Sequence, residues 1–166
     1  MHRYWTPFVA RDADRVVAID TAPETMEIAR GRVPECKVDF RVVDAYKLSP
    51  KLGTFNAAFA GFWFSHVPRA RRREFLSGLN AVLGSGAKVV LLDNVYVEGS
   101  STPIAETDAG GNTYQLRRLK DGSTHRVLKN FPSEAEMHLA IDELGQCGIF
   151  NVWEHYWAFD YVTSQS

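Results

Sequence analysis

The first half of the chain alternates between two patterns of hydrophobic positions. Four short runs are apolar at nearly every position, as in strands that are buried on both faces of a sheet. These runs are 15–20, 38–43, 55–61 and 87–93. Between them, apolar residues recur at helical spacing over 24–32 and 71–83. Strands that alternate with helices predict an α/β fold, with a mostly parallel sheet and helices on both of its faces.

The pattern changes in the second half of the chain. Residues 98–112 are rich in Gly, Ser and Thr and predict a mobile loop. Two strand-like runs flank an Asp-Gly turn within 114–131 and predict a β-hairpin inserted into the fold. The elements expected after it are a helix and two strands, antiparallel to one another, at 132–144, 150–156 and 158–163. With neither a repeat nor a linker, 1–166 is expected to be a single domain.

Composition narrows the classes of partner. The 166 residues are 45% hydrophobic and 23% charged, which is typical of a globular domain. The formal net charge of -1 gives no reason to expect nucleic acid or an acidic membrane as partner. The basic stretch 69–73 is interpreted as the solvated start of a helix.

Cysteine usage and hydropathy indicate a cytoplasmic protein. Cys36 and Cys147 are not at metal-ligand spacing and are too few for a disulfide framework, so reduced thiols are expected. Residues 1–11 lack the apolar segment of a signal peptide, and no run is long enough to span a membrane. No metal site is predicted.

Three of the predicted strands end on an acid: Asp20, Asp44 and Asp93. The carboxyl ends of parallel strands lie at one edge of a sheet, where α/β proteins bind their ligands. Two interpretations of Asp20 are open at this point. Its carboxylate could accept hydrogen bonds from the hydroxyls of a ribose, or it could cap the helix that begins near Pro23.

Five segments together carry a resemblance to a known family. They are Val-Val-Ala-Ile-Asp-Thr-Ala-Pro-Glu-Thr-Met (16–26), Asp-Ala-Tyr (44–46), Phe-Ala-Gly-Phe-Trp-Phe-Ser-His-Val-Pro (59–68), the turn and strand at 84–93, and the hairpin at 117–133. In this order they resemble the class I S-adenosylmethionine-dependent methyltransferases. More narrowly, the chain resembles the small-molecule, phosphonate-type O-methyltransferases of that class, with a Rossmann-like fold.

The resemblance implies S-adenosylmethionine (SAM) as cofactor and S-adenosylhomocysteine (SAH) as its product. It assigns Asp20 to the ribose hydroxyls, and Asp44 with Ala45 to the adenine ring. The residues that it implies around the cofactor are Tyr4, Trp5, Thr6, Asp20, Thr21, Met26, Asp44, Ala45, Gly61 and Phe62.

One part of the family pattern is missing. The family's first strand and Gly-x-Gly-x-Gly loop should precede Tyr4, where this sequence has three residues. That strand would lie between 15–20 and 55–61, so the fold is expected to be N-terminally truncated at the centre of its sheet. Three alternatives are open: a longer natural protein, a second chain that fills the gap, or direct pairing of the two flanking strands. We expect self-association through the unpaired centre.

The resemblance also suggests groups for the reaction. His66 follows the third strand-like run and is the candidate base, although it could instead pack the loop beside Pro68. Arg117, Arg118 and Lys129 lie on the hairpin and could bind an anionic acceptor. Adjacent strand residues point to opposite faces, so at most one arginine of the pair faces inward.

Trp63 is a further candidate for acceptor binding, and lid or core packing is the alternative for this side chain. The sequence therefore favours methyl transfer from SAM to a small, anionic acceptor, by an O-methyltransferase-like reaction. A non-catalytic remnant or oligomerising module is the first alternative. A nicotinamide-dependent oxidoreductase is the second, but neither its glycine fingerprint nor a Tyr-x-x-x-Lys pair is present.

Overall fold

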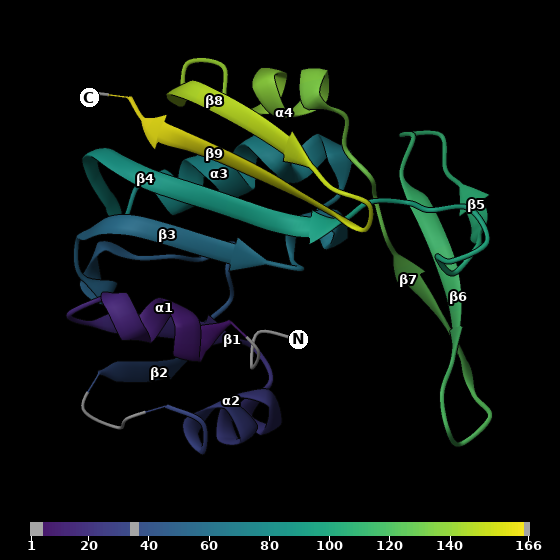
Figure 1. Ribbon diagram of the computed structural model, residues 1–166, viewed down its shortest axis with the longest axis horizontal. Helices are drawn as coiled ribbons and strands as arrows, with labels where there is room; N and C mark the ends of the chain where they lie inside the picture. The colour runs from purple at the N-terminus through teal and green to yellow at the C-terminus, as the bar shows by residue number, and fades with distance from the viewer. Residues whose placement is uncertain (1–4, 34–36, 165–166) are drawn as a thin grey trace.

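Three separate sheets make up the β structure of the computed structural model, which describes residues 5–33 and 37–164 (Figure 1). Two strands form a parallel pair, β1 (Val16–Asp20) and β2 (Val38–Val42). The four-stranded sheet has the order β3 (Phe55–Gly61), β4 (Leu83–Asn94), β9 (Tyr156–Thr163) and β8 (Gly145–Val152). The third sheet consists of β5 (Ile104–Thr107), β6 (Thr113–Arg118) and β7 (Thr124–Leu128).

The helices that the structure describes are α1 (Thr6–Asp12), α2 (Pro23–Arg30), α3 (Arg72–Asn80) and α4 (Glu134–Ala140). Short 3-10 turns in the described connections are η2 (Pro50–Leu52), η3 (Phe64–His66) and η4 (Arg69–Arg71). A capping box begins α4, since the Ser133 side chain accepts from the Glu136 amide and the Glu136 side chain accepts from the Ser133 amide. The predicted α/β class is confirmed.

The predicted mixture of strand directions is also confirmed. β3 runs parallel to β4, whereas β9 is antiparallel to both β4 and β8. In Figure 1, the sheet of β5, β6 and β7 lies beyond the end of the four-stranded sheet to which the arrowheads of β3 and β4 point. The hairpin therefore stands next to the edge of the sheet at which the acids were predicted.

Several predicted boundaries are wrong. The helix expected over 71–83 ends at Asn80, and β4 begins at Leu83, which pairs with Phe55 of β3. The glycines at 84 and 86, expected in a turn before the strand, thus lie within β4. The strand expected over 150–156 is β8, which spans Gly145–Val152. The loop expected over 98–112 contains β5, whose four residues are all exposed. A strand with no buried face lacks the alternation by which the sequence would reveal it.

The basic stretch 69–73 is only partly solvated, which corrects a further expectation. Arg71 pairs with Glu74, and Arg73 pairs with Glu143, at the surface. Arg72 is buried, and its guanidinium lies 5.5 Å from the centre of the Phe64 ring. Burial lowers the pKa of Arg72 to about 10. Long side chains can bury an apolar stem while the charged end finds a partner, which sequence alone does not show.

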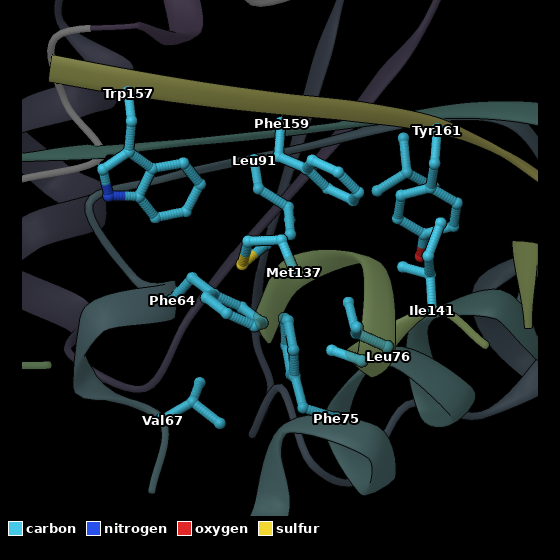
Figure 2. Packing of buried hydrophobic residues seen from close by; sticks show 12 residues of the cluster. Phe64, Val67, Phe75, Leu76, Leu91, Met137, Ile141, Trp157, Phe159 and Tyr161 are labelled. Carbon is cyan, nitrogen blue, oxygen red and sulfur yellow. The ribbon is translucent and has the colours of Figure 1, made fainter. Parts of the chain in front are cut away.

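The hydrophobic core lies between the four-stranded sheet and the helices α3 and α4 (Figure 2). β9 contributes Trp157, Phe159 and Tyr161 at alternate positions, and all three point toward the helices in Figure 2. The Tyr161 hydroxyl donates to Asn80 Oδ1 at 2.9 Å, which fixes the end of α3 against β9. This packing gives β4 and β9 a rigid support, so the residues at their ends are held in defined positions.

A cleft separates the parallel pair β1–β2 from strand β3 of the four-stranded sheet. β1 and β3 belong to different sheets, and no described strand lies between them. The cleft has a volume of about 480 Å³, and its walls come mainly from α1, β1, β3 and the side of β4. Phe59 of β3 is 37% exposed here. Direct pairing of the two strands, one of the three alternatives, is therefore wrong for this structure.

The helix α1 covers the cleft and is anchored at its carboxyl end by Lys37. The Lys37 ammonium donates to the carbonyl oxygens of Ala10, Arg11 and Ala13, at 3.2, 3.3 and 3.3 Å. A cation at this end also interacts favourably with the helix dipole.

Among the helices that the structure describes, none is long and apolar enough to cross a membrane.

Candidate functional site

The ends of β1, β2 and β3 meet around one end of the cleft. Asp20 is the last residue of β1, Gly61 is the last residue of β3, and Ala45 follows β2. All three line the cleft, together with Thr21 from the start of the next turn. The structure thus brings these four predicted cofactor residues to one place.

Both acidic side chains organise the turn that follows their strand. Asp20 Oδ1 accepts from the Ala22 amide at 2.9 Å, and Asp44 Oδ1 accepts from the Tyr46 amide at 3.0 Å. Each turn orients its carboxylate at the carboxyl end of a strand. Asp20 does not cap α2, because the N-cap of this helix is Ala22 and no side chain caps it. The ribose interpretation of Asp20 stays a prediction.

The aromatic side chains at the end of β3 surround Gly61. The Trp5 ring lies 6.0 Å from the Phe59 ring and 6.3 Å from the Phe62 ring, measured between centres. A β-carbon at position 61 would lie 2.9 Å from Phe59 Cε1 and 3.2 Å from Trp5 Cδ1. Only glycine therefore permits this close approach of two aromatic rings to the backbone. Trp5 and Thr6, both predicted cofactor residues, line the cleft.

Three other predicted cofactor residues, Met26, Asp44 and Phe62, are not among the residues that line the cleft. Met26 is 5% exposed and is one of the residues that α2 buries, and it is not among the residues that line the cleft. Tyr4 lies outside the described residues, as does Cys36. Trp63, a predicted acceptor residue, lines the cleft and packs against the rings of Tyr46 and Phe75, at 6.3 and 6.4 Å.

His66 ends η3 and faces the hairpin. Its Nδ1 lies 2.7 Å from the carbonyl oxygen of Leu128, which can only accept, so Nδ1 carries the proton of this hydrogen bond. In the neutral ring, Nε2 then has a free lone pair and can accept a proton. Burial, and next the charge of Lys129, lower the pKa of His66 from its ordinary value of 6.5. Near neutral pH the ring is therefore uncharged, as a general base must be.

Lys129 is buried, at 4% exposure, and forms an ion pair with Asp93. The distance from Lys129 Nζ to Asp93 Oδ1 is 2.7 Å. Nζ also donates to Ser65 Oγ at 2.8 Å and to Asn94 Oδ1 at 3.3 Å. An ammonium group has three hydrogens, and these three acceptors use all of them.

A second, polar pocket of about 300 Å³ lies between the hairpin, the loop after β4 and the β8–β9 turn. Arg117 and Gln115 of β6 both line it, as expected for residues two apart on a strand. Arg118, between the pocket and the hairpin tip, is exposed and is not a lining residue. Of the two arginines, Arg117 is the one that lines the pocket, and its role in acceptor binding stays a prediction.

Arg117 has no acidic partner within the described part of the chain. Its Nη2 donates to Gln115 Oε1 at 3.3 Å, and the ion pairs found among residues 5–33 and 37–164 do not include it. The Gln115 amide in turn donates to the Thr102 carbonyl at 2.6 Å. A half-buried cation without a counter-ion in a polar pocket is a binding group for an anion.

Sequence reasoning missed part of this pocket. Gln115 could have been predicted from the sequence, because it lies two residues before Arg117 on the same strand and therefore on the same face. His155 lies in the turn between β8 and β9, and Ser101 lies in the loop after β4. No local pattern marks these two, because only the tertiary fold brings them to the hairpin.

Comparison with known proteins places this geometry in a family. A family model described as "Methyltransferase domain" matches residues 4–86, which is half of the chain. The complex of DhpI with SAH has a TM-score of 0.78 at 24% identity, over 98% of this chain and 72% of that chain. The complex of DhpI with SAM and HEP has a TM-score of 0.75 at 27% identity, over 95% and 72%.

CalS10 with bound SAM, an amino pentose methyltransferase from Micromonospora echinaspora, is also similar. Its TM-score is 0.67 at 18% identity, over 94% of this chain and 77% of that chain. No curated protein matches significantly. The chain belongs to the methyltransferase domain family, and its fold is that of the class I SAM-dependent methyltransferases, whose cofactor is SAM.

The state of His66 gives a testable prediction. The folded-state pKa lies below that of the unfolded chain, so the neutral ring stabilises the fold above about pH 6.5, and this contribution is lost as the pH falls through the folded-state pKa. The free energy of unfolding should therefore fall less between pH 7 and pH 5 in His66→Gln than in the natural chain, as measured by urea denaturation. Equal losses in the two chains would contradict the buried, neutral imidazole.

Proposed function

We propose that the chain is an O-methyltransferase that transfers the methyl group of SAM to a small, anionic acceptor. The observation that carries the proposal is Arg117, a cation with no acidic partner among the described residues, in a polar pocket of about 300 Å³. His66 lines neither pocket, but its Nδ1 is bonded to the Leu128 carbonyl on the hairpin that carries Arg117. An anion-binding group and a candidate base joined through one hairpin would suit such a reaction.

The residues at the first cleft fit the cofactor. The volume of about 480 Å³ is within the usual range for small-molecule sites, roughly 300–1,000 Å³. Asp20 would accept hydrogen bonds from the ribose hydroxyls, and Asp44 with the Ala45 amide would bind the adenine edge. Bound there, SAM supplies a methyl group on a positively charged sulfur. Trp5 and Phe59 would position the end of β3 beside the bound cofactor, because both rings pack close to the Gly61 backbone.

Acceptor binding is assigned to Arg117 and not to Arg118 or Lys129. Arg118 is exposed outside the pocket, and the hydrogens of the Lys129 ammonium are all donated within the protein. Trp63 packs among aromatic side chains, so its part is to shape the wall of the cleft. Two neighbours support a small-molecule acceptor without indicating its charge: DhpI in complex with SAM and HEP, and CalS10, an amino pentose methyltransferase.

The protein's own part in the reaction is positioning and proton removal. Arg117 holds the anionic end of the acceptor, which aligns its hydroxyl with the methyl group. Alignment alone can supply roughly 7–11 kcal/mol of barrier lowering at best. His66 Nε2 would accept the hydroxyl proton as the methyl group passes from the sulfur of SAM to the acceptor oxygen, which leaves SAH. General-base catalysis of this kind contributes roughly 10²–10⁴-fold in rate.

Asp20→Ala should weaken SAH binding by about 1.5–3 kcal/mol, the range for hydrogen bonds to a charged group. Asp44→Ala should weaken it less, because the adenine amine is one contact among several. Isothermal titration calorimetry measures both effects. Asp14→Ala is the matched control, since Asp14 is an exposed aspartate just before β1. Unchanged affinity in a folded Asp20→Ala chain would remove Asp20 from the site.

The two arginines of the hairpin give the test of the acceptor. Labelled methyl transfer is measured with a hydroxyalkyl phosphonate, a hydroxycarboxylic acid and a neutral diol of similar size. The anionic acceptors should be methylated faster than the diol. Arg117→Gln should raise the acceptor KM about 10–100-fold, which corresponds to losing one charge-assisted hydrogen bond.

Arg118→Gln serves as the control and should change the acceptor KM less than about twofold, because this side chain is exposed. Equal small effects of the two substitutions would favour solvated charge at both positions. Faster methylation of the diol than of both anions would contradict an anionic acceptor.

A second candidate function, an oligomerising module, is favoured by the cleft between β1 and β3. Apolar strand edges that face a cleft can recruit another chain by strand pairing. On this proposal the chain self-associates through these edges. Light scattering coupled to size-exclusion chromatography should then show concentration-dependent dimers or larger species, and Ala58→Asp on the cleft wall of β3 should reduce them. A monodisperse monomer at all concentrations would contradict it.

A further inference from the structure

A buried ion pair joins the hairpin sheet to the end of β4, and no step of the proposed reaction uses it. Asp93 is the second-last residue of β4 and is fully buried, and Lys129 directly follows β7. Their contact is 2.7 Å long. The Asp93 carboxylate has further partners on the sheet side, since Oδ1 also accepts from the Asn94 amide at 2.8 Å.

The same two residues hold the 3-10 turn that carries His66. Asp93 Oδ2 accepts from the Ser65 amide at 3.0 Å, and Lys129 donates to Ser65 Oγ. The Ser65 carbonyl accepts from the Asn130 amide at 2.7 Å. Asn130 Nδ2 also donates to the Val67 carbonyl at 3.1 Å. The residues on both sides of His66 are thus tied to the segment that follows β7.

The orientation of the His66 ring depends on that segment. Its Nδ1–H bond ends on the carbonyl of Leu128, the residue immediately before Lys129. Arg117 lies on β6, the neighbouring strand, where it pairs with His125 of β7. A movement of β7 away from η3 would therefore release the imidazole and displace the anion-binding group at the same time.

We propose that Asp93 and Lys129 are positioning residues, whose ion pair holds β7 against η3 and thereby keeps His66 Nε2 available as the proton acceptor. The catalytic consequence rests on the proposed function. The structural part concerns only the ring of His66 and the hairpin, and it can be measured without turnover.

The charged groups that act on His66 set the direction of the expected change. Burial has the largest effect on the pKa of His66 and the charge of Lys129 the next largest, and both lower it. The hydrogen bond to Leu128 and the charge of Asp93 raise the pKa by less, and Arg117 lowers it. Neutralising the pair removes the charge of Lys129, whose effect is larger than that of Asp93. A looser turn also exposes the ring. The pKa of His66 should therefore rise toward its ordinary value of 6.5.

The test uses the full chain with Lys129→Met and Asp93→Asn combined, so that neither charge is left buried alone. Nitrogen NMR of the ring reports the tautomer and the pKa of His66, with His66→Gln to assign the signal. We expect the fixed proton on Nδ1 to be lost and the pKa to rise. In turnover, kcat at neutral pH should fall about tenfold or more, and its acid limb should move to higher pH, while the KM for SAM changes less than about twofold.

Lys120→Met, at the exposed tip of the hairpin, is the matched control and should leave every one of these quantities unchanged. A merely structural role would lower the amount of folded protein without altering the tautomer or the pKa, and that result overturns the proposal. If the double variant does not fold, Ser65→Ala removes one acceptor of Lys129 and should raise the pKa of His66 by a smaller amount. No change in a folded Ser65→Ala chain would also overturn it.

The outcome is separable from that of the proposed function. A chain that transfers no methyl group, but whose His66 tautomer changes in the double variant, contradicts methyl transfer and supports the positioning role. An active chain whose double variant keeps the natural tautomer and pH profile supports methyl transfer and contradicts the positioning role.

Discussion

The buried ion pair between Asp93 and Lys129 is the charged centre of the contacts that hold the hairpin, and the bonds of Asn130 and His66 to its neighbours add to it. Removing two charges from water costs several kcal/mol for each ion, and the cost is offset only where geometry and hydrogen bonding are good. Here the carboxylate accepts two backbone amides besides the ammonium, and the ammonium donates to three oxygens. Leaving either charge alone would cost roughly 3–5 kcal/mol, so displaced positions of the hairpin are strongly disfavoured. The interaction thus defines one arrangement of the acceptor pocket.

The rest of the site depends on where strands end. β1, β2 and β3 deliver Asp20, Ala45 and Gly61 to one end of a cleft, and β4 delivers Asp93 to the buried pair. The strands themselves are held by a core of aromatic side chains on β9 (Figure 2). The residues that we propose for the cofactor and for the acceptor therefore lie on separate sheets, and the turn that contains His66 connects β3 to the segment before α3.

Much of this arrangement could be predicted from the sequence, and the rest could not for physical reasons. Apolar runs identified β1, β2 and β3 with nearly the observed bounds. The predicted burial on both faces is wrong, because most residues of these strands are half-buried or exposed. β5 was missed because none of its residues is buried. Lys129 was expected to contact the acceptor, but a carboxylate 36 residues away occupies it, and no local pattern shows such a pair. His155 was missed for the same reason, since only the fold brings its turn to the pocket.

The central claim is that one chain binds SAM at the ends of β1, β2 and β3, beside a pocket for the acceptor. Backbone amide NMR of the chain during titration with SAH tests it most directly. The account predicts saturable shifts that cluster at Ala22, Ala45 and Phe62, next to the two carboxylates and the end of β3, with smaller shifts at the hairpin. Shifts that cluster elsewhere, or no shifts in a folded chain at millimolar SAH, would contradict it.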